Sequence, residues 1–181
     1  KVCVIDVLEN DYFIGDLADQ GALEAFAAKV IADYGHVDYL INNAAPKMCG
    51  IEDCSYKDFE YALKVGVTAP FYLTKLFMPY FAEGASIVNI SSSRDRMSQP
   101  QTESYTAAKG GISALTHAQA VSFAVRSSTI GWRFFAMAGI TETHPTHGNT
   151  NGMAVTLQLA ERDFHGLCFV NLVDFDMIYG H

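Results

Sequence analysis

A serine, a tyrosine and a lysine in this sequence have the types and the spacing of a proton-transfer unit. Tyr105 and Lys109 are four residues apart, so a helix through this segment places both side chains on one face. A tyrosine phenol has a pKa of about 10, so it acts as an acid or a base near neutrality only where a cation stabilises its phenolate. Lys109 can supply that charge, and Ser92 can hydrogen-bond a substrate oxygen beside the phenol. The three residues predict proton transfer at a carbonyl or an alcohol.

A tyrosine and a lysine at this spacing also occur on ordinary helix surfaces, where the tyrosine is exposed and the lysine is solvated. The predicted elements around the pair therefore decide its meaning. Segment 85–90 is a short apolar run that predicts a buried strand, and Ser92 follows it. Segment 103–123, which contains Tyr105 and Lys109, predicts the next helix. Ligands of parallel sheets bind beyond the carboxyl ends of the strands, which is where Ser92 would lie.

Strands and helices alternate along the first two thirds of the sequence. Apolar runs predict buried strands at 2–8, 37–41 and 85–90, and helical periodicity predicts helices at 20–34, 56–81 and 103–123. Asp19 is the expected N-cap of the first helix and Gly35 its stop, and Pro70 is expected to bend the second. This order predicts an α/β protein of one domain, residues 1–181, with a three-layer α/β/α Rossmann-type fold and a doubly wound parallel sheet. Further along, the sequence predicts strands at 130–138 and 169–173 and a helix at 153–160.

Composition excludes several classes of partner. The sequence has 12 basic and 20 acidic residues, and the resulting net charge of −8 repels the phosphates of a nucleic acid. No apolar run reaches the roughly 18 residues that cross a bilayer, so no membrane partner is expected. His144 and His147 lack a third ligand, so no metal site is expected. The absence of a C-x-x-C pair predicts reduced thiols and a cytoplasmic setting for four cysteines: Cys3, Cys49, Cys54 and Cys168.

Several segments, in the order in which they occur, resemble the short-chain dehydrogenase/reductase family. Asn42–Ala45 resembles the family's N-N-A-G motif, and Tyr105–Gly111 contains its Y-x-x-x-K motif. The thirteen-residue step from Ser92 to Tyr105 also fits the family. The other matching segments are Asp6, Gly15–Leu17 and Ile87–Ser92. The resemblance covers roughly residues 1–125 and implies a nicotinamide-dependent oxidoreductase.

The resemblance implies a role for each member of the proton-transfer unit. Tyr105 would be the general acid/base. Lys109 would lower the pKa of Tyr105 and bind the nicotinamide ribose, and Ser92 would orient the substrate. All three would act on a small alcohol or carbonyl compound.

The resemblance also implies a set of cofactor-binding residues. Asp6 would bind the adenosine ribose hydroxyls, and its charge favours NAD over NADP because it repels a 2′-phosphate. Asp16 and Leu17 match the segment that flanks the adenine. Asn43, Ala44 and Ala45 match the strand end that passes under the cofactor. Asp6 could alternatively be a turn residue at a strand end, and Asn42 and Asn43 could be ordinary turn formers.

The sequence departs from the family pattern at several places. The family has a strand and a glycine-rich turn before the strand that carries Asp6, and this first β-α unit is missing here. Only six residues separate Leu8 from Gly15, too few for the crossover between parallel strands. Gly66 stands where the family has an asparagine that extends its proton relay. The C-terminal third matches least, so we expect a sequence that is truncated or gapped.

Two functional hypotheses follow. The first is an oxidoreductase that transfers a hydride between NAD(H) and a secondary alcohol or ketone, with Tyr105 as the general acid/base. The alternative is a non-catalytic Rossmann scaffold that has lost dinucleotide binding along with the glycine-rich turn. Helices 56–81 and 103–125 carry more apolar side chains than one buried face needs, and in the family such helices pair between subunits. A homodimer or homotetramer is therefore expected, although the same chain could also cover both helices.

Overall fold

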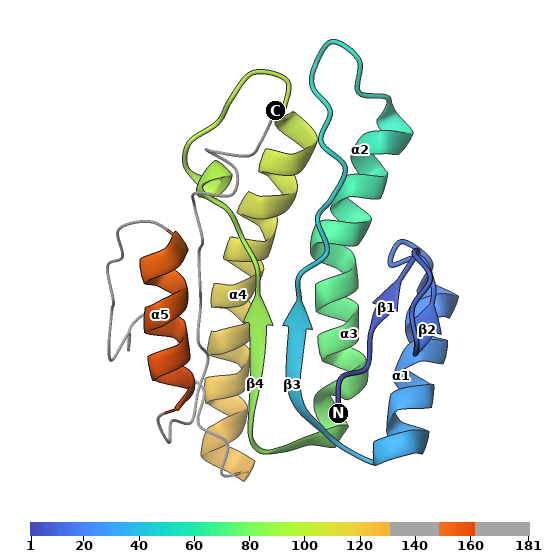
Figure 1. Ribbon diagram of the computed structural model, residues 1–181, viewed down its shortest axis with the longest axis vertical. Helices are drawn as coiled ribbons and strands as arrows, with labels where there is room; N and C mark the ends of the chain where they lie inside the picture. The colour runs from blue at the N-terminus through green and yellow to red at the C-terminus, as the bar shows by residue number, and fades with distance from the viewer. Residues whose placement is uncertain (131–148, 162–181) are drawn as a thin grey trace.

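The computed structural model of this chain describes residues 1–130 and 149–161 (Figure 1). The strands are β1 (Ile5–Asp6), β2 (Phe13–Ile14), β3 (Val37–Asn42) and β4 (Phe81–Asn89). The α-helices are α1 (Gln20–Tyr34), α2 (Tyr56–Leu63), α3 (Ala69–Phe77), α4 (Glu103–Ile130) and α5 (Asn149–Ala160). Shorter helical turns of other types are η1 (Lys64–Thr68, π-helical), η2 (Met78–Tyr80, 3-10) and η3 (Ser93–Asp95, 3-10).

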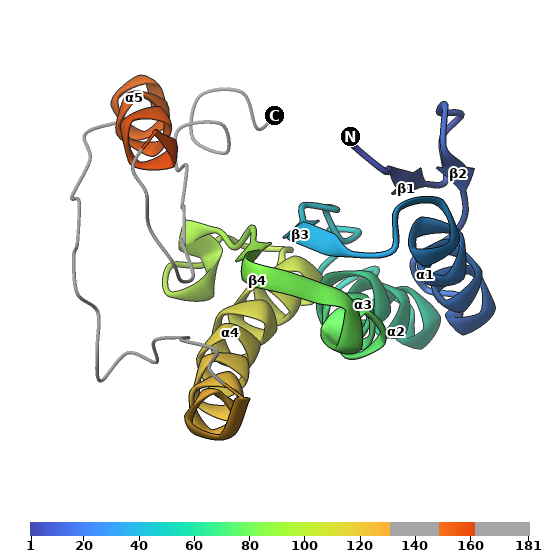
Figure 2. The same ribbon diagram turned by 90° about the horizontal axis from the view of Figure 1, so that it is seen from below.

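The strands form parallel pairs with helices on both sides. β1 pairs with β2, and β3 pairs with β4 in a register that places Leu40 opposite Ile87 and Ile41 opposite Val88. Figure 2 shows α1, α3 and α4 on one side of the β3–β4 pair and α5 on the other. This arrangement confirms the predicted α/β fold of Rossmann type. Among the described residues, the two strand pairs are not hydrogen-bonded to each other.

The prediction of a buried strand at residues 2–8 is wrong. Only Ile5–Asp6 is a strand, and the exposed fractions of Val2 and Leu8 are 84% and 70%. An apolar run predicts burial only if other strands and helices cover both faces of the strand. Here β1 has β2 as its partner, and its flanking residues have no such cover within the described part of the chain.

The first helix begins and ends at the residues that the sequence predicts. The Asp19 side chain accepts a hydrogen bond from the backbone N–H of Gly21, which caps the first turn of α1. Gly35 adopts a left-handed conformation with φ of 76°, and its N–H donates to the Ile31 carbonyl. Both signals act within a few residues of the helix end, which is why the sequence alone sufficed.

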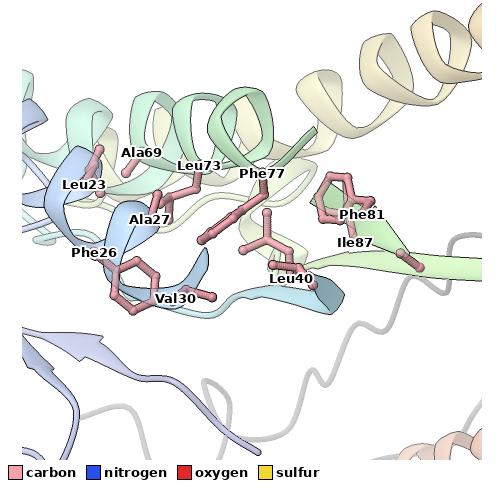
Figure 3. Packing of buried hydrophobic residues seen from close by; sticks show 12 residues of the cluster. Leu23, Phe26, Ala27, Val30, Leu40, Ala69, Leu73, Phe77, Phe81 and Ile87 are labelled. Carbon is pink, nitrogen blue, oxygen red and sulfur yellow. The ribbon is translucent and has the colours of Figure 1, made fainter. Parts of the chain in front are cut away.

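The hydrophobic core lies between α1, α3 and the β3–β4 pair (Figure 3). Phe26 of α1 and Phe77 of α3 meet edge to face, with ring centroids 6.1 Å apart. Leu40 of β3 and Ile87 of β4 close the core from the strand side. The core therefore fixes the β3–β4 pair, whose carboxyl ends carry the predicted site, against α1 and α3.

The single bent helix predicted at 56–81 is replaced by a series of shorter helical segments. The predicted start is correct, because Ser55 caps α2 by accepting a hydrogen bond from the Asp58 N–H. The α-helix then gives way to the π-helical turn η1, in which the Ala69 N–H donates to the Lys64 carbonyl five residues back. Pro70 follows at once, and its missing N–H cannot bond the carbonyl four residues earlier. The change of hydrogen-bond pattern thus lies where the sequence places a bend.

The later elements differ from the prediction mainly in length. β4 begins at Phe81 rather than Ala85, and α4 runs to Ile130 rather than ending at 123. The predicted helix at 153–160 lies within α5. Three of the predicted features lie outside the described residues. They are the strand at 169–173, residues 131–138 of the strand at 130–138, and the histidines His144 and His147. No helix in the described part of the chain is long and apolar enough to span a membrane.

The expectation that all the cysteines are reduced is wrong for one pair. Cys49 and Cys54 are joined by a disulfide, with Cα atoms 5.0 Å apart. Five residues of separation do not reveal such a bond, because the loop between the cysteines must first fold back on itself. Cys3 is a free thiol, and Cys168 lies outside the described residues.

Candidate active site

Lys109 connects α4 to the end of β4. Its Nζ donates a hydrogen bond to the Ile90 carbonyl, 2.7 Å away, and lies 5.5 Å from the centroid of the Tyr105 ring. The side chain is only 4% exposed, so its charge must be compensated locally. The structure thus brings the predicted lysine to the predicted tyrosine and to a residue two positions before Ser92.

Ser92 is buried at the point where β4 passes into η3. Its exposed fraction is 3%, and its Oγ accepts a hydrogen bond from the Arg94 N–H at 3.2 Å. As the N-cap of η3, Ser92 has an extended backbone and is held by the turn that follows it. Tyr105 lies in the first turn of α4 and is half-buried. That Ser92 and Tyr105 share a substrate oxygen stays a prediction.

A hydroxyl network that the sequence analysis missed ties the same region together. The Ser91 Oγ donates to the Lys109 carbonyl at 2.9 Å and lies 2.7 Å from the Ser113 Oγ. Ser113 donates to Asp95 in η3 at 2.8 Å. These contacts fix the loop after β4 to the turn of α4 that carries Lys109. Ser113 stands four residues after Lys109, a spacing that could have indicated a shared helix face.

A second buried network joins the ends of both strands to α4. The Asn42 side-chain amide donates to the Asn89 Oδ1 at 2.7 Å, and the Asn89 amide donates to the Thr116 Oγ1 at 2.9 Å. Asn89 is 2% exposed, so water cannot replace a hydrogen bond that its side chain loses, and such a loss would destabilise the fold. Asn42 therefore has a role in fixing β3 to β4, beyond forming a turn.

The residues predicted to bind adenosine lie together near the β1–β2 pair. Asp6 is exposed, its Oδ1 accepts from the Leu8 N–H at 2.9 Å, and its carbonyl accepts from the Gly15 N–H at 2.8 Å. Asp16 accepts a hydrogen bond from the Tyr61 hydroxyl at 3.0 Å. Burial and this hydrogen bond raise the pKa of Tyr61. Asp6 therefore forms the turn that the alternative interpretation foresaw, and its exposure leaves it accessible to a ligand.

The remaining predicted cofactor residues differ in exposure. Leu17, next to Asp16, is partly buried against the core. Asn43, Ala44 and Ala45 follow β3 and are all exposed. The Ile90 N–H donates to the Asn42 carbonyl at 3.0 Å, so this exposed segment begins beside the strand end that leads to Ser92.

Comparison with known proteins identifies the family of the chain. A family model described as enoyl-(acyl carrier protein) reductase matches residues 4–159. The chain belongs to the short-chain dehydrogenase/reductase family. The members of this family are oxidoreductases that use nicotinamide cofactors.

Individual relatives agree with this assignment. An uncharacterized oxidoreductase of Thermotoga maritima is 36% identical over 129 residues, which cover 65% of this chain and 49% of the relative. The structure of an apo SCOR enzyme from Clostridium thermocellum superimposes with a TM-score of 0.67 at 28% identity, covering 94% of this chain and 81% of that one. The chain thus spans about half the length of the Thermotoga relative.

A shorter match of a different kind is also present. A phosphopentomutase of Lachnoclostridium phytofermentans is 55% identical over 47 residues, which are 26% of this chain and 12% of that protein. This match covers about an eighth of the mutase, so it assigns no mutase activity here.

Position 66, where the family is expected to have its relay asparagine, has no room for a side chain. Gly66 is buried in η1, and a Cβ at this position would lie 2.7 Å from the Ala108 Cβ and 3.3 Å from the Pro46 Cγ. The backbone of η1 therefore packs directly on the turn of α4 between Tyr105 and Lys109. A longer side chain at position 66 has no room without a shift of one of these elements.

The residues present fit one half of a nicotinamide dinucleotide better than the other. A buried ammonium beside a phenol, with the exposed segment Asn43–Ala45 nearby, provides suitable groups for the nicotinamide and its ribose. Asp6 offers an accessible carboxylate to ribose hydroxyls. The glycine-rich turn that would hold the pyrophosphate is not in the sequence, so no role in pyrophosphate binding is assigned to any residue.

Proposed function

We propose that the protein is an oxidoreductase that interconverts a secondary alcohol and a ketone with NAD(H), using Tyr105 as the general acid/base. The observation that supports this most is the position of Lys109, whose buried ammonium lies beside the Tyr105 ring and bonds the Ile90 carbonyl at the end of β4. A cation held in this place stabilises a phenolate. An ordinary helix surface would leave the lysine solvated.

In the direction of alcohol oxidation, the Tyr105 phenolate takes the proton of the substrate hydroxyl. Ser92 hydrogen-bonds the same oxygen and holds it in place. Lys109 stabilises the phenolate before the transfer. Lys109 and the segment Asn43–Ala45 would hold the nicotinamide and its ribose, and this group would supply the hydride acceptor for the substrate carbon. In ketone reduction, Tyr105 returns the proton.

The preference for NAD(H) rests on Asp6. Its carboxylate is exposed at the end of β1, where it would accept hydrogen bonds from ribose hydroxyls and repel a 2′-phosphate. We expect saturable binding of NADH, followed by nicotinamide fluorescence, and weaker binding of NADPH. The substitution Asp6→Ser should reduce the difference between the affinities for NADH and NADPH. Equal binding of NADH and NADPH by the unmodified protein would contradict the assigned role of Asp6.

A second candidate function is a non-catalytic scaffold of the same family. The feature that favours it is Gly66, which stands where the family is expected to have the asparagine of its proton relay. A folded protein that binds neither cofactor, and shows no turnover with a panel of secondary alcohols, would support the scaffold over the enzyme.

We also propose that the protein is a homodimer or homotetramer, with α2, α3 and α4 in the subunit contact. Large apolar side chains on these helices are exposed in the single chain, including Tyr56 (79%), Phe71 (48%) and Val121 (53%). Such side chains are typical of a covered surface. Light scattering coupled to size-exclusion chromatography gives the subunit number, and a monomer at all concentrations would refute the proposal.

A further inference from the structure

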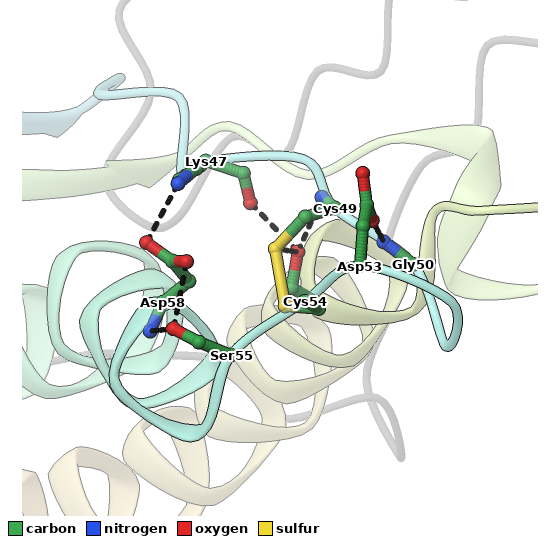
Figure 4. Close-up of polar contacts among 8 residues, drawn as sticks. Lys47, Cys49, Gly50, Asp53, Cys54, Ser55 and Asp58 are labelled. Atoms are coloured by element: carbon green, nitrogen blue, oxygen red, sulfur yellow. Dashed lines mark hydrogen bonds and ion pairs between the residues drawn. A yellow bond between two sulfur atoms is a disulfide. The ribbon is translucent and has the colours of Figure 1, made fainter.

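The loop closed by Cys49 and Cys54 binds the beginning of α4. The Ser104 N–H donates to the Cys49 carbonyl at 3.2 Å, and the Cys49 N–H donates to the Ser104 Oγ at 2.9 Å. Ser104 is the residue directly before Tyr105. Two reciprocal hydrogen bonds thus connect the disulfide loop (residues 49–54) to the residue next to the proposed general acid/base. Figure 4 shows the disulfide of Cys49 and Cys54 and the hydrogen bond from the Gly50 N–H to the Asp53 carboxylate.

Contacts with the residues just before Ser104 extend this connection. The Ile51 N–H donates to the Glu103 carboxylate at 3.2 Å, and the Glu52 N–H donates to the Gln101 side-chain oxygen at 3.3 Å. Gln101 has a positive φ of 60°, and a Cβ on Gly50 would collide with its backbone and side chain. The disulfide loop therefore closes tightly around residues 101–104.

The Ser104 hydroxyl lies beside the Cys49 sulfur. Its single hydrogen is donated to the Lys47 carbonyl at 2.8 Å, and its oxygen lies 3.5 Å from the Cys49 Sγ. Ser104 is fully buried, so water does not compete for these contacts. A bond made or broken at the Cys49 sulfur therefore acts directly beside Ser104, the residue that precedes Tyr105.

The two cysteines differ in their exposure to solvent. Cys49 is 8% exposed, Cys54 is partly exposed, and Ile51 between them is 82% exposed. A small reagent therefore reaches Cys54 more readily than Cys49. This difference in exposure suits Cys54 as the attacking cysteine and Cys49 as the resolving cysteine.

We propose that Cys49 and Cys54 form a reversible thiol–disulfide site that sets the order of the first turn of α4. In oxidation, the Cys54 thiolate attacks a low-molecular-weight disulfide and releases one small thiolate. The Cys49 thiolate then attacks the Cys54 sulfur and releases the second. The protein loses two protons and two electrons, and one small disulfide becomes two small thiols. Excess small thiol reverses both steps. In a reducing compartment such a bond is transient, as redox-sensing disulfides are.

The consequence for catalysis rests on the proposed function. The closed loop holds residues 101–104 and, through them, the backbone of Tyr105. The open loop is free to leave these contacts, so the reduced protein should have the more mobile α4 start and the lower turnover.

The test uses the double variant Cys3→Ser/Cys168→Ser, which leaves only the proposed pair. This protein is equilibrated in buffers of varied reduced to oxidised glutathione, its thiols are trapped with a mass tag, and backbone amide exchange is measured across 49–54 and 101–105. We expect one two-electron transition, and exchange of the Ser104 amide that is at least about tenfold faster in the reduced form. Turnover is followed in parallel.

The variant Cys54→Ser in the same background keeps Cys49 and its backbone contacts but cannot form the bond. It should show the fast exchange of the reduced form at every glutathione ratio. A transition without any change at Ser104, or no protein disulfide even in oxidised glutathione, would overturn the proposal. Trapping and amide exchange need neither cofactor nor substrate. A normal redox response without turnover would therefore contradict the proposed enzyme function and leave the thiol–disulfide site in place.

Discussion

The Lys109 ammonium is bonded to the Ile90 carbonyl, so one hydrogen bond of 2.7 Å joins a helix side chain to the end of β4. Replacing Lys109 by Met removes the cation beside Tyr105 and leaves the partly buried Ile90 carbonyl without this donor. We expect turnover to fall by at least about a hundredfold, with a loss of folding free energy of about 1–3 kcal/mol. Lys75→Met on the exposed side of α3 is the matched control and should leave turnover unchanged. Equal turnover in both variants would remove Lys109 from the mechanism.

Tyr105→Phe should abolish turnover without unfolding the protein. The ring and its packing remain, and only the proton-carrying hydroxyl is lost. A fall of about 10²–10⁴-fold is expected for loss of a general acid/base, with unchanged circular dichroism and nearly unchanged NADH binding. Tyr39→Phe, at a tyrosine that is 71% exposed, serves as the control. Undiminished turnover of the Tyr105 variant would refute its role.

Gly66→Ala tests the close packing of η1 on α4. The new Cβ would lie 2.7 Å from the Ala108 Cβ, so we expect a loss of about 1–3 kcal/mol in the free energy of unfolding. Gly110→Ala in α4 is the contrasting variant, because a Cβ there meets nothing within 4 Å. Ala is favoured over Gly in a helix, so this variant should gain up to about 1 kcal/mol. Urea denaturation measures both, and equal effects would contradict the packing seen at Gly66.

The ion pair of Lys47 with Asp58 gives a dependence of stability on pH. The hydrogen bond from Lys47 and a second from Ser55 lower the pKa of Asp58 below its usual value of about 4. The carboxylate therefore stabilises the fold at pH values above its ordinary pKa and loses this effect as the pH falls through the lowered pKa. Asp58→Asn should lower the Tm at neutral pH and have no effect at low pH. Glu60→Gln is the control, and a Tm difference for Asp58→Asn that persists in acid would contradict the prediction.

Local signals in the sequence predicted the helix ends well. Asp19 and Gly35 bound α1 because each acts on backbone groups a few residues away. The same holds for Ser55, whose hydroxyl caps α2. Tyr105 and Lys109 are brought together by the period of one helix, so the lysine's place beside the ring also follows from the sequence.

Features that depend on distant segments could not be predicted in the same way. The exposure of Val2 and Leu8 depends on which elements cover β1, and the apolar run itself does not reveal these elements. The disulfide of Cys49 and Cys54 requires a loop conformation fixed by contacts with Gln101–Ser104. The bond between Asn89 and Thr116 joins residues 27 positions apart and leaves no local pattern.

The π-helical turn η1 sets the rotational phase between the two helices that it joins. Successive residues of an α-helix are about 100° apart around the axis, so one residue more or fewer in a turn rotates everything after it by that angle. On one side of η1, Gly66 faces α4 and the proposed active site, and on the other side Leu73 and Phe77 face the core. If a single residue between Lys64 and Thr68 were deleted, the helix could keep Gly66 against α4 only by rotating Leu73 and Phe77 out of the core. The length of η1 must therefore satisfy two requirements at once, the packing of Gly66 on α4 and the burial of Leu73 and Phe77.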